Sequence, residues 1–398
     1  MNETQEYFIK LLSSHLNNSP PPQKENADWM GVFKLGELHN VTAMLCLEIK
    51  KLPAQFRPEK NIMSIFNQAL GLAVQRYDNK TKSLNALNEV LNENKIPRLF
   101  LKGAAIKDLY PTPEVRTSGD IDLVVNKIDF DVSTYILVQN GFELAQKSDI
   151  QSVLIINDEE FELKNYIDCF NKNTELFFNN PFDESKSENI TEYVYHLKPT
   201  YHLIYIISHI IKHLITGGVG LRQLMDVDVL IRSGLVDTDL LFKIARELNI
   251  EKSVKVIISL SKDYFNTPID LDYQIENQLK ESLESVILNG GVFGFAISNP
   301  GTIRLTKSVN NTKSSGFLAS VKALLMMIFV NKNYLYTNYP YSNNHHFLLP
   351  IAFLNRLFDA IFKRGKSNVK NVKTIFKDKE TAIMLSDIID ELEIEKDF

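Results

Sequence analysis

The sequence is poor in cysteine, with only Cys46 and Cys169 in 398 residues. So few cysteines provide no disulfide framework, and a reducing compartment is expected. Long apolar runs are also missing: Val321–Val330 is mostly apolar but too short to cross a bilayer, and it predicts a buried helix. The start, Met1–Ser13, carries acids and lacks the basic-then-apolar order of a signal peptide. We therefore expect a cytoplasmic protein with no membrane partner.

Positive charge is not in excess either. The chain has 44 lysines and arginines against 49 aspartates and glutamates, a net charge of −5. No positive field over the whole chain draws it to nucleic acid, so DNA is not expected as a partner and RNA would need a local basic groove. The hydrophobic content of 44% and charged content of 23% are typical of a globular protein. The length favours two or three domains.

Helical spacing of apolar residues dominates the N-terminal part, residues 1–95. A first helix is expected over residues 1–16, where Asn17–Pro22 ends it, and a second helical stretch over Trp29–Leu52. Ile62–Asn92 predicts one long helix or two in tandem. We expect this part to be an N-terminal helical region.

The middle part, residues 96–198, alternates between short apolar runs and helical spacing. This alternation predicts a small domain with a mixed sheet and packed helices. The expected strands are 98–101, 121–125, 142–145, 153–156, 161–167 and 174–178, and the expected helices are 104–109 and 130–139.

The last part, residues 199–398, is expected to be largely α-helical, so the fold class of the whole chain is α+β. A polar segment at Thr302–Ser315 predicts a loop, and the basic segment Lys363–Lys377 predicts a solvated surface. The expected helices are 201–215, 221–231, 238–248, 252–264, 274–288, 318–330 and 347–362.

The most informative motif is Asp120-Ile121-Asp122, followed by the apolar run Leu123–Val125. Side chains alternate along a strand, so the two carboxylates share a face while Ile121 points into a core. Two like charges this close repel unless a cation lies between them. Mg²⁺ prefers such oxygen ligands and keeps sites open for substrate phosphates. An isolated Asp-x-Asp is also common in solvated turns.

Two positions before this motif suggest phosphate binding. Lys102-Gly103 ends a predicted strand and begins a helix, where backbone N–H groups and the helix N-terminus favour an anion. Arg116 lies four residues before Asp120 and can grip a phosphate through its planar fork. The alternatives for Arg116 are an ion pair that orients Asp120, or simple solvation.

This order of strand, Lys-Gly, helix, Arg and Gly-Asp-x-Asp resembles the polymerase-β-like nucleotidyltransferase superfamily. More narrowly, it resembles the bacterial family described as uncharacterised nucleotidyltransferases. The residues that carry the resemblance are Leu101–Gly103, Tyr110-Pro111, Arg116 and Gly119–Leu123, followed by Ile210–Leu214, Gly220–Asp226, Asn289–Gly294, Tyr339–Tyr341 and Leu348–Arg356.

The resemblance implies a polymerase-β-like nucleotidyltransferase domain at 96–198, flanked by helices, with the helical half binding the acceptor. The activity implied is transfer of an NMP from an NTP, with ATP as the expected donor, to an unknown acceptor hydroxyl with release of pyrophosphate. Mg²⁺ or Mn²⁺ is the implied metal. One departure from the family pattern is Ala104, which follows Gly103 where relatives have a serine or glycine.

A third carboxylate is needed to hold two metals, because the pair must stabilise both the attacking and the leaving oxygen. Glu175 is the preferred candidate, since it lies in a predicted strand and where the resemblance expects an acid. Glu162 is the competing candidate, and Asp168 is a weaker one. With Glu175, the predicted catalytic and metal-binding set is Asp120, Asp122 and Glu175.

The helical half supplies predicted substrate-binding residues. The resemblance implies that His213, Arg222 and Asp226 line the cleft opposite the metals. His209 and His213 also have the i, i+4 spacing of zinc ligands, but no third ligand is evident and a packed pair is favoured. Arg222 and Asp226 have the same spacing, for which a local ion pair is the simplest account.

Two other functions remain open on the sequence. The chain can be a non-catalytic nucleotide-binding or interaction module that retains the fold, for which Ala104 is the main support. It can also be a toxin-like nucleotidyltransferase that modifies RNA, although the acidic net charge disfavours this. No P-loop, nucleophile elbow or Cys-x-x-Cys pair is present in the sequence.

Overall fold

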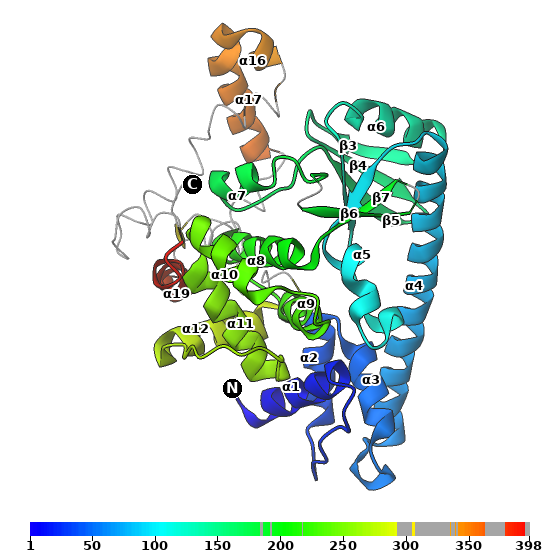
Figure 1. The fold of residues 1–398 in the computed structure, drawn as a ribbon, viewed down its shortest axis with the longest axis vertical. Coiled ribbons are helices and arrows are strands. Elements are labelled where there is room, and N and C mark those ends of the chain that lie inside the picture. Colours follow the sequence, from blue (N-terminus) through cyan, green and yellow to red (C-terminus); the bar gives the residue numbers. More distant parts are fainter. Residues whose placement is uncertain are drawn as a thin grey trace.

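A computed structural model describes residues 1–183, 186–191, 193–216, 218–292, 305–306, 335, 339, 341–362 and 379–394. A sheet lies beside one long helix, and a group of shorter helices covers the opposite side of the molecule (Figure 1). The mixed α+β class expected from the sequence is confirmed. The expected helix at 318–330, the basic segment at 363–377 and nearly all of the expected loop at 302–315 lie outside the described residues.

The N-terminal part is helical, as predicted. The stretch expected at Trp29–Leu52 is two helices, because Asn40 adopts a left-handed conformation with φ +55° and ends the first of them. The stretch at Ile62–Asn92 is one continuous helix of 34 residues. The elements are α1 (Glu3–Leu16), α2 (Trp29–His39), α3 (Thr42–Lys51), the short 3₁₀ helix η1 (Ala54–Phe56) and α4 (Lys60–Glu93).

The sheet has seven strands in the order β3-β4-β5-β2-β1-β7-β6. Strand β2 lies in the centre, antiparallel to β1 and parallel to β5, and all five of its residues are buried. The strands are β1 (Arg98–Phe100), β2 (Ile121–Val125), β3 (Glu143–Lys147), β4 (Gln151–Ile156), β5 (Glu159–Lys164), β6 (Ser187–Thr191) and β7 (Val194–Leu197). Between them lie α5 (Lys102–Ile106), η2 (Lys107–Leu109), η3 (Pro113–Val115) and α6 (Phe130–Gln139).

The strand expected at 174–178 is wrong. Residues Lys172–Phe177 form a short helix, α7, because Asn171 caps it: its side chain accepts a hydrogen bond from the Thr174 backbone N–H at 2.9 Å. The sequence pattern also missed β6 and β7. The segment of β6 reads Ser-Glu-Asn-Ile-Thr and has no apolar alternation to mark a strand.

In the described residues of the C-terminal part, the predicted helices are present, apart from the one at 318–330, which lies outside those residues. Two α-helices there were not predicted, α16 and α19. No helix within the described ranges is both long and apolar enough to cross a membrane. The elements are α8 (Pro199–Thr216), α9 (Leu221–Arg232), α10 (Thr238–Glu247), α11 (Glu251–Phe265), α12 (Asn277–Gly290), α16 (Tyr341–Asn344), η4 (His346–Leu348), α17 (Leu349–Phe362) and α19 (Lys379–Glu391).

The N-terminal and C-terminal helices share one hydrophobic core. Phe8 of α1 and Leu45 of α3 belong to the same buried cluster as Leu224 of α9 and Ile257 of α11. A second, smaller cluster lies between the sheet, α4 and α6. The helices at the two ends of the chain therefore form one packed body, with the sheet attached to it.

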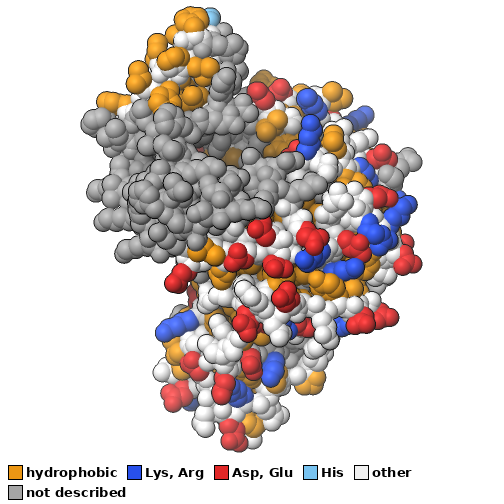
Figure 2. All heavy atoms as spheres, turned by 90° about the vertical axis from the view of Figure 1, so that its left-hand side faces the viewer, with side chains coloured by type: hydrophobic (Ala, Val, Ile, Leu, Met, Phe, Trp, Pro, Cys, Tyr) orange, Lys and Arg blue, Asp and Glu red, His pale blue; other side chains and the backbone are white. Residues whose placement is uncertain are grey.

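Charged side chains of both signs are interspersed over the described part of the face in Figure 2. No single basic region gathers there, in keeping with the net charge of −5. A long-range electrostatic attraction to nucleic acid therefore finds no support on this face.

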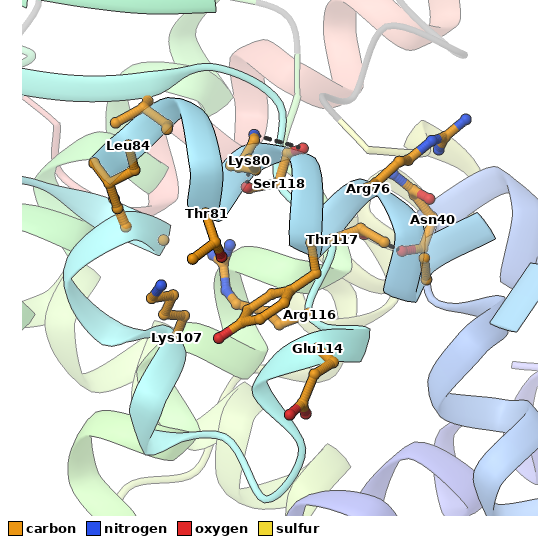
Figure 3. Close-up of a pocket in the computed structure, with 15 residues that line it drawn as sticks. Asn40, Arg76, Lys80, Thr81, Leu84, Lys107, Glu114, Arg116, Thr117 and Ser118 are labelled. Carbon is orange, nitrogen blue, oxygen red and sulfur yellow. Dashed lines mark hydrogen bonds between the residues drawn. The ribbon is translucent and has the colours of Figure 1, made fainter. Parts of the chain in front are cut away.

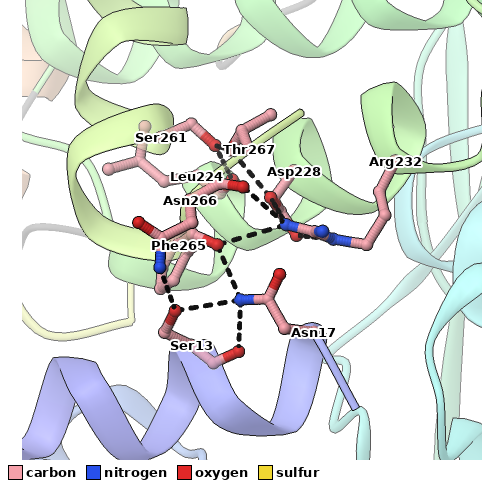
Figure 4. Close-up of polar contacts among 9 residues, drawn as sticks. All are labelled: Ser13, Asn17, Leu224, Asp228, Arg232, Ser261, Phe265, Asn266 and Thr267. Atoms are coloured by element: carbon pink, nitrogen blue, oxygen red, sulfur yellow. Dashed lines mark hydrogen bonds and ion pairs between the residues drawn. The ribbon is translucent and has the colours of Figure 1, made fainter. Parts of the chain in front are cut away.

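A buried polar network joins α1, α9 and the end of α11 (Figure 4). Asp228, which has no exposed surface, accepts hydrogen bonds from Arg232 at 2.7 and 3.0 Å and from the Thr267 hydroxyl at 2.7 Å. Arg232 also donates to the Phe265 carbonyl at 3.1 Å, and Asn17, the C-terminal cap of α1, donates to that same carbonyl at 2.8 Å. The network therefore ties the chain's first helix to the helices that carry the core.

Replacing Asp228 tests this network. Asp228→Asn leaves the Arg232 guanidinium without its carboxylate, and breaking a buried pair costs about 3–5 kcal/mol. We expect the low end, about 3 kcal/mol, because Arg232 keeps contact with water. Urea unfolding followed by circular dichroism measures the change in the free energy of unfolding. The matched control is Asp270→Asn at an exposed position, and equal stability of the two variants would contradict this account.

Candidate active site

Three carboxylates meet on neighbouring strands of the sheet. Asp120 directly precedes β2, Asp122 is the second residue of that strand, and Glu162 lies on the parallel strand β5. Asp122 and Glu162 are register partners across β2 and β5, so their side chains leave the same face of the sheet. One carboxylate oxygen from each of the three residues lies within 4.8 Å of the others. We call Asp120, Asp122 and Glu162 the acidic cluster.

Glu162 takes the place in this cluster that was expected for Glu175. Glu175 lies in the first turn of α7, so it is on no strand of the sheet, and it is not among the grouped carboxylates. Asp168, the weaker candidate, is paired with Lys212. The signal for Glu162 is the strict alternation along β5, in which Phe161 and Leu163 are fully buried and Glu162 faces the other way.

Two lysines neutralise the buried member of the cluster. Lys102 Nζ lies 2.7 Å from one Asp122 oxygen, and Lys164 Nζ lies 2.8 Å from the other. Burial raises the pKa of Asp122, but the two ammonium groups outweigh it and hold that pKa well below its usual range. Lys164 also contacts Glu162 at 2.5 Å. Asp122 therefore stays ionised at neutral pH and can act as a cation ligand.

Lys102 reaches Asp122 from an unusual backbone position. Its φ of +50° lies in the left-handed region, which a residue with a side chain adopts at a cost. The residue lies where β1 ends and α5 begins, and its neighbour Leu101 donates a backbone hydrogen bond to the Asp122 carbonyl at 3.1 Å. This backbone turn directs the Lys102 ammonium toward the acidic cluster.

Gly103 has a steric role that the sequence did not show. A β-carbon at this position would lie 2.1 Å from an Arg116 nitrogen, and that guanidinium is itself held in place. The expected phosphate contact of Gly103 remains a prediction, but the glycine is needed in any case for Arg116 to pass beside the backbone.

Arg116 pairs with Asp226 and not with Asp120. Its Nη2 donates to the two Asp226 oxygens at 2.8 and 2.9 Å, and its Nε donates to one of them at 3.2 Å. The Tyr110 hydroxyl also donates to Asp226, at 2.5 Å. Both members of the ion pair have side chains that are only 8% exposed. Arg116 and Asp226 thus satisfy each other, and they join the loop before β2 to helix α9.

Arg222 does not form the expected local ion pair with Asp226. It donates to the Thr117 carbonyl at 2.5 Å and to the Thr117 hydroxyl at 3.2 Å. Among the described residues no carboxylate is paired with Arg222. Burial and the charge of nearby Arg116 lower the pKa of Arg222 to about 10. Within the described part of the chain, the guanidinium is therefore a positive charge on the cleft wall with no carboxylate at salt-bridge distance.

His209 and His213 lie across the cleft from the cluster. Their Nε2 atoms are 2.8 Å apart, so one ring donates to the other. Burial, assisted by the charge of Lys102, lowers the pKa of His213 to about 4 and that of His209 well below its usual value. Both rings are therefore neutral at pH 7. The described part of the chain groups no third histidine, cysteine or acid with them, which speaks against zinc.

The acidic cluster opens into a cleft between the sheet and helices α8 and α9. Its cavity volume is about 350 Å³, which falls in the range of about 300–1,000 Å³ typical of small-molecule sites. One wall carries the acidic cluster and Lys102, and the other carries His213 and Arg222. The structure therefore gathers most of the predicted site residues around one cleft.

The chain matches a family model described as "Uncharacterised nucleotidyltransferase" over residues 25–266. This segment contains the acidic cluster, Lys102, and the helices that form both walls of the cleft. No curated protein and no solved structure matches the chain. The family match covers more than half of the sequence, so the chain belongs to the family of uncharacterised nucleotidyltransferases.

Proposed function

We propose that this protein is a metal-dependent nucleotidyltransferase that moves an NMP from an NTP, with ATP as the donor, to an acceptor hydroxyl and releases pyrophosphate. The observation that carries the proposal is the acidic cluster at the cleft, with its ligand atoms within 4.8 Å of one another. Membership of a nucleotidyltransferase family supports the general reaction. The proposed fold of residues 96–198 is the polymerase-β-like domain, with residues 199–398 supplying the wall for the acceptor.

The donor set of the cluster suits a hard divalent cation. Carboxylate oxygens from Asp120, Asp122 and Glu162 are the ligands that Mg²⁺ and Mn²⁺ prefer. When bound, such a cation stabilises the charge that develops on the transferred phosphoryl oxygens. The carboxylates hold the cation, and one of them accepts the proton of the attacking hydroxyl.

Lys102 is proposed to move from the cluster to the triphosphate. Its side chain is 25% exposed, so its ammonium can exchange Asp122 for a phosphate oxygen as a cation arrives. Lys164 is only 8% exposed and remains as the fixed counter-charge of Asp122. The backbone at Gly103 and the start of α5 remain proposed phosphate contacts, although α5 is only five residues long.

The opposite wall is proposed to bind the acceptor. His213 is a neutral ring that can exchange hydrogen bonds, and Arg222 is a cation without a carboxylate partner among the described residues. Both line the cleft that contains the acidic cluster. Asp226 and Arg116 are instead proposed to hold the two walls together, because each already satisfies the other.

A second candidate function is nucleotide binding without transfer. Its specific support is that Lys102 and Lys164 both pair with the Asp122 carboxylate and balance its charge. Ala104 adds to this, since it has no hydroxyl to donate to a phosphate. Retention of a labelled NTP with no transfer of label would favour this candidate.

Label transfer tests the main proposal. The protein is incubated with each α-³²P-labelled NTP, Mg²⁺ or Mn²⁺, and a cell lysate that supplies acceptors. We expect label to move to an acceptor and chelation by EDTA to abolish the transfer. Asp120→Asn should reduce the rate by about 100-fold or more, because it removes a carboxylate from the cluster. Equal transfer by Asp120→Asn and the unsubstituted protein would refute the role of the cluster.

The third carboxylate is tested by a matched pair of variants. Glu162→Gln should lower label transfer by about 100-fold, because it removes a ligand oxygen charge while keeping the side-chain shape. Glu175→Gln should leave transfer within about twofold, since Glu175 lies outside the cluster. Urea unfolding of both variants checks that each is folded. If Glu175→Gln lowered label transfer and Glu162→Gln did not, Glu175 would be the third carboxylate.

A further inference from the structure

Lys80 extends from helix α4 to the loop just before Asp120 (Figure 3). Its ammonium donates to the Ser118 hydroxyl at 3.0 Å, to the Ser118 carbonyl at 3.3 Å, and to the Gly119 carbonyl. Gly119 is the residue that immediately precedes Asp120. One side chain of the N-terminal region therefore fixes the backbone that delivers a member of the acidic cluster.

The same ammonium also reaches the neighbouring strand. Lys80 Nζ lies 3.4 Å from a carboxylate oxygen of Glu159, the first residue of β5. Strand β5 carries Glu162. The loop that Lys80 contacts leads through Asp120 into β2, which carries Asp122. Lys80 therefore links the two strands whose separation determines the distances within the cluster.

Other contacts to this loop act further from Asp120. The Thr117 hydroxyl donates to the Asn40 carbonyl at 2.5 Å, and Arg222 donates to the Thr117 carbonyl. Both hold Thr117, three residues before Asp120. Within the described part of the chain, the carbonyls of Ser118 and Gly119 receive their hydrogen bonds from Lys80 alone.

We propose that Lys80 is a positioning residue that holds Asp120, through the Ser118-Gly119 backbone, at the distance from Asp122 and Glu162 that a divalent cation requires. The proposal rests on the proposed function, since it gives the acidic cluster a metal to bind. Lys80 is not among the residues that line the cleft. It contacts the loop from α4.

A small cavity beside Lys80 makes the proposal testable by chemical rescue. The side chain lines a cavity of about 60 Å³ between α4 and α5, together with Thr81 and Ala104 (Figure 3). Truncation by Lys80→Ala would enlarge this space in front of the Ser118 and Gly119 carbonyls. A free ethylammonium ion could then enter and donate to the same carbonyls. Because the cavity adjoins the ammonium, we expect the larger head group of Lys80→Arg to fit there as well.

The experiment measures the Mn²⁺ dissociation constant by electron paramagnetic resonance for the full chain. Lys80→Met keeps the stem and removes the ammonium, and we expect it to weaken Mn²⁺ binding at least tenfold, as should Lys80→Ala. Lys80→Arg, and Lys80→Ala with ethylammonium chloride, should recover most of the affinity, whereas sodium chloride at equal ionic strength should not. The control is Lys82→Ala, an exposed lysine of the same helix, with unchanged affinity expected.

Three results would overturn the proposal in distinguishable ways. Tight Mn²⁺ binding by Lys80→Met, with the unsubstituted protein also binding, would refute the role of Lys80 and leave the proposed function standing. A loss of affinity that neither arginine nor ethylammonium restores would also refute positioning by the ammonium. Absence of Mn²⁺ binding in the unsubstituted protein would refute the proposed function itself. If Lys80→Ala does not fold in urea titrations, the Met and Arg variants decide the outcome.

Discussion

The buried ion pair of Arg116 and Asp226 is the interaction on which the cleft depends. It joins the loop before the central strand to α9 across 110 residues of sequence. A buried pair repays its desolvation only if the geometry is good and the remaining polar atoms are satisfied. Here the pair is two-pronged, and Tyr110 donates to the same carboxylate. Gly103 is the steric counterpart, because any side chain there would displace the guanidinium. The two walls of the cleft are therefore fixed relative to each other at its base.

The positive charges in the cleft explain how three carboxylates can lie close together in the folded protein. Asp122 is buried beside two other carboxylates, an arrangement that is costly unless positive charge is close. Lys102 and Lys164 provide that charge, Lys102 from a partly exposed position and Lys164 from a buried one. A cation and a triphosphate arriving together would bring both signs of charge, so Lys102 could exchange its partner with little change in net charge. In the proposed reaction, the cluster would therefore receive a triphosphate together with its metal ion.

How much of this the sequence predicted depends on the distance between partners along the chain. The Asp-x-Asp strand and most helices follow from local periodicity, and the structure confirms them. The strand expected around Glu175 failed, because the cap formed by Asn171 outweighs the apolar run that follows. The partner of Arg116 could not be read from one sequence, since no local pattern connects it to Asp226. The contact of Lys80 with Gly119, 39 residues away, is hidden for the same reason.

These long-range contacts show that the proposed site depends on helices outside the sheet. The sheet of residues 96–198 carries the acidic cluster, yet the loop before Asp120 is held by Lys80 of α4, by the Asn40 carbonyl and by Arg222 of α9. The family match spans residues 25–266, which includes all three of these supports. A domain that contains the sheet alone would keep the three carboxylates but lose the contacts that place one of them. The smallest unit able to bind a cation in the proposed way therefore includes the helices on both sides of the sheet.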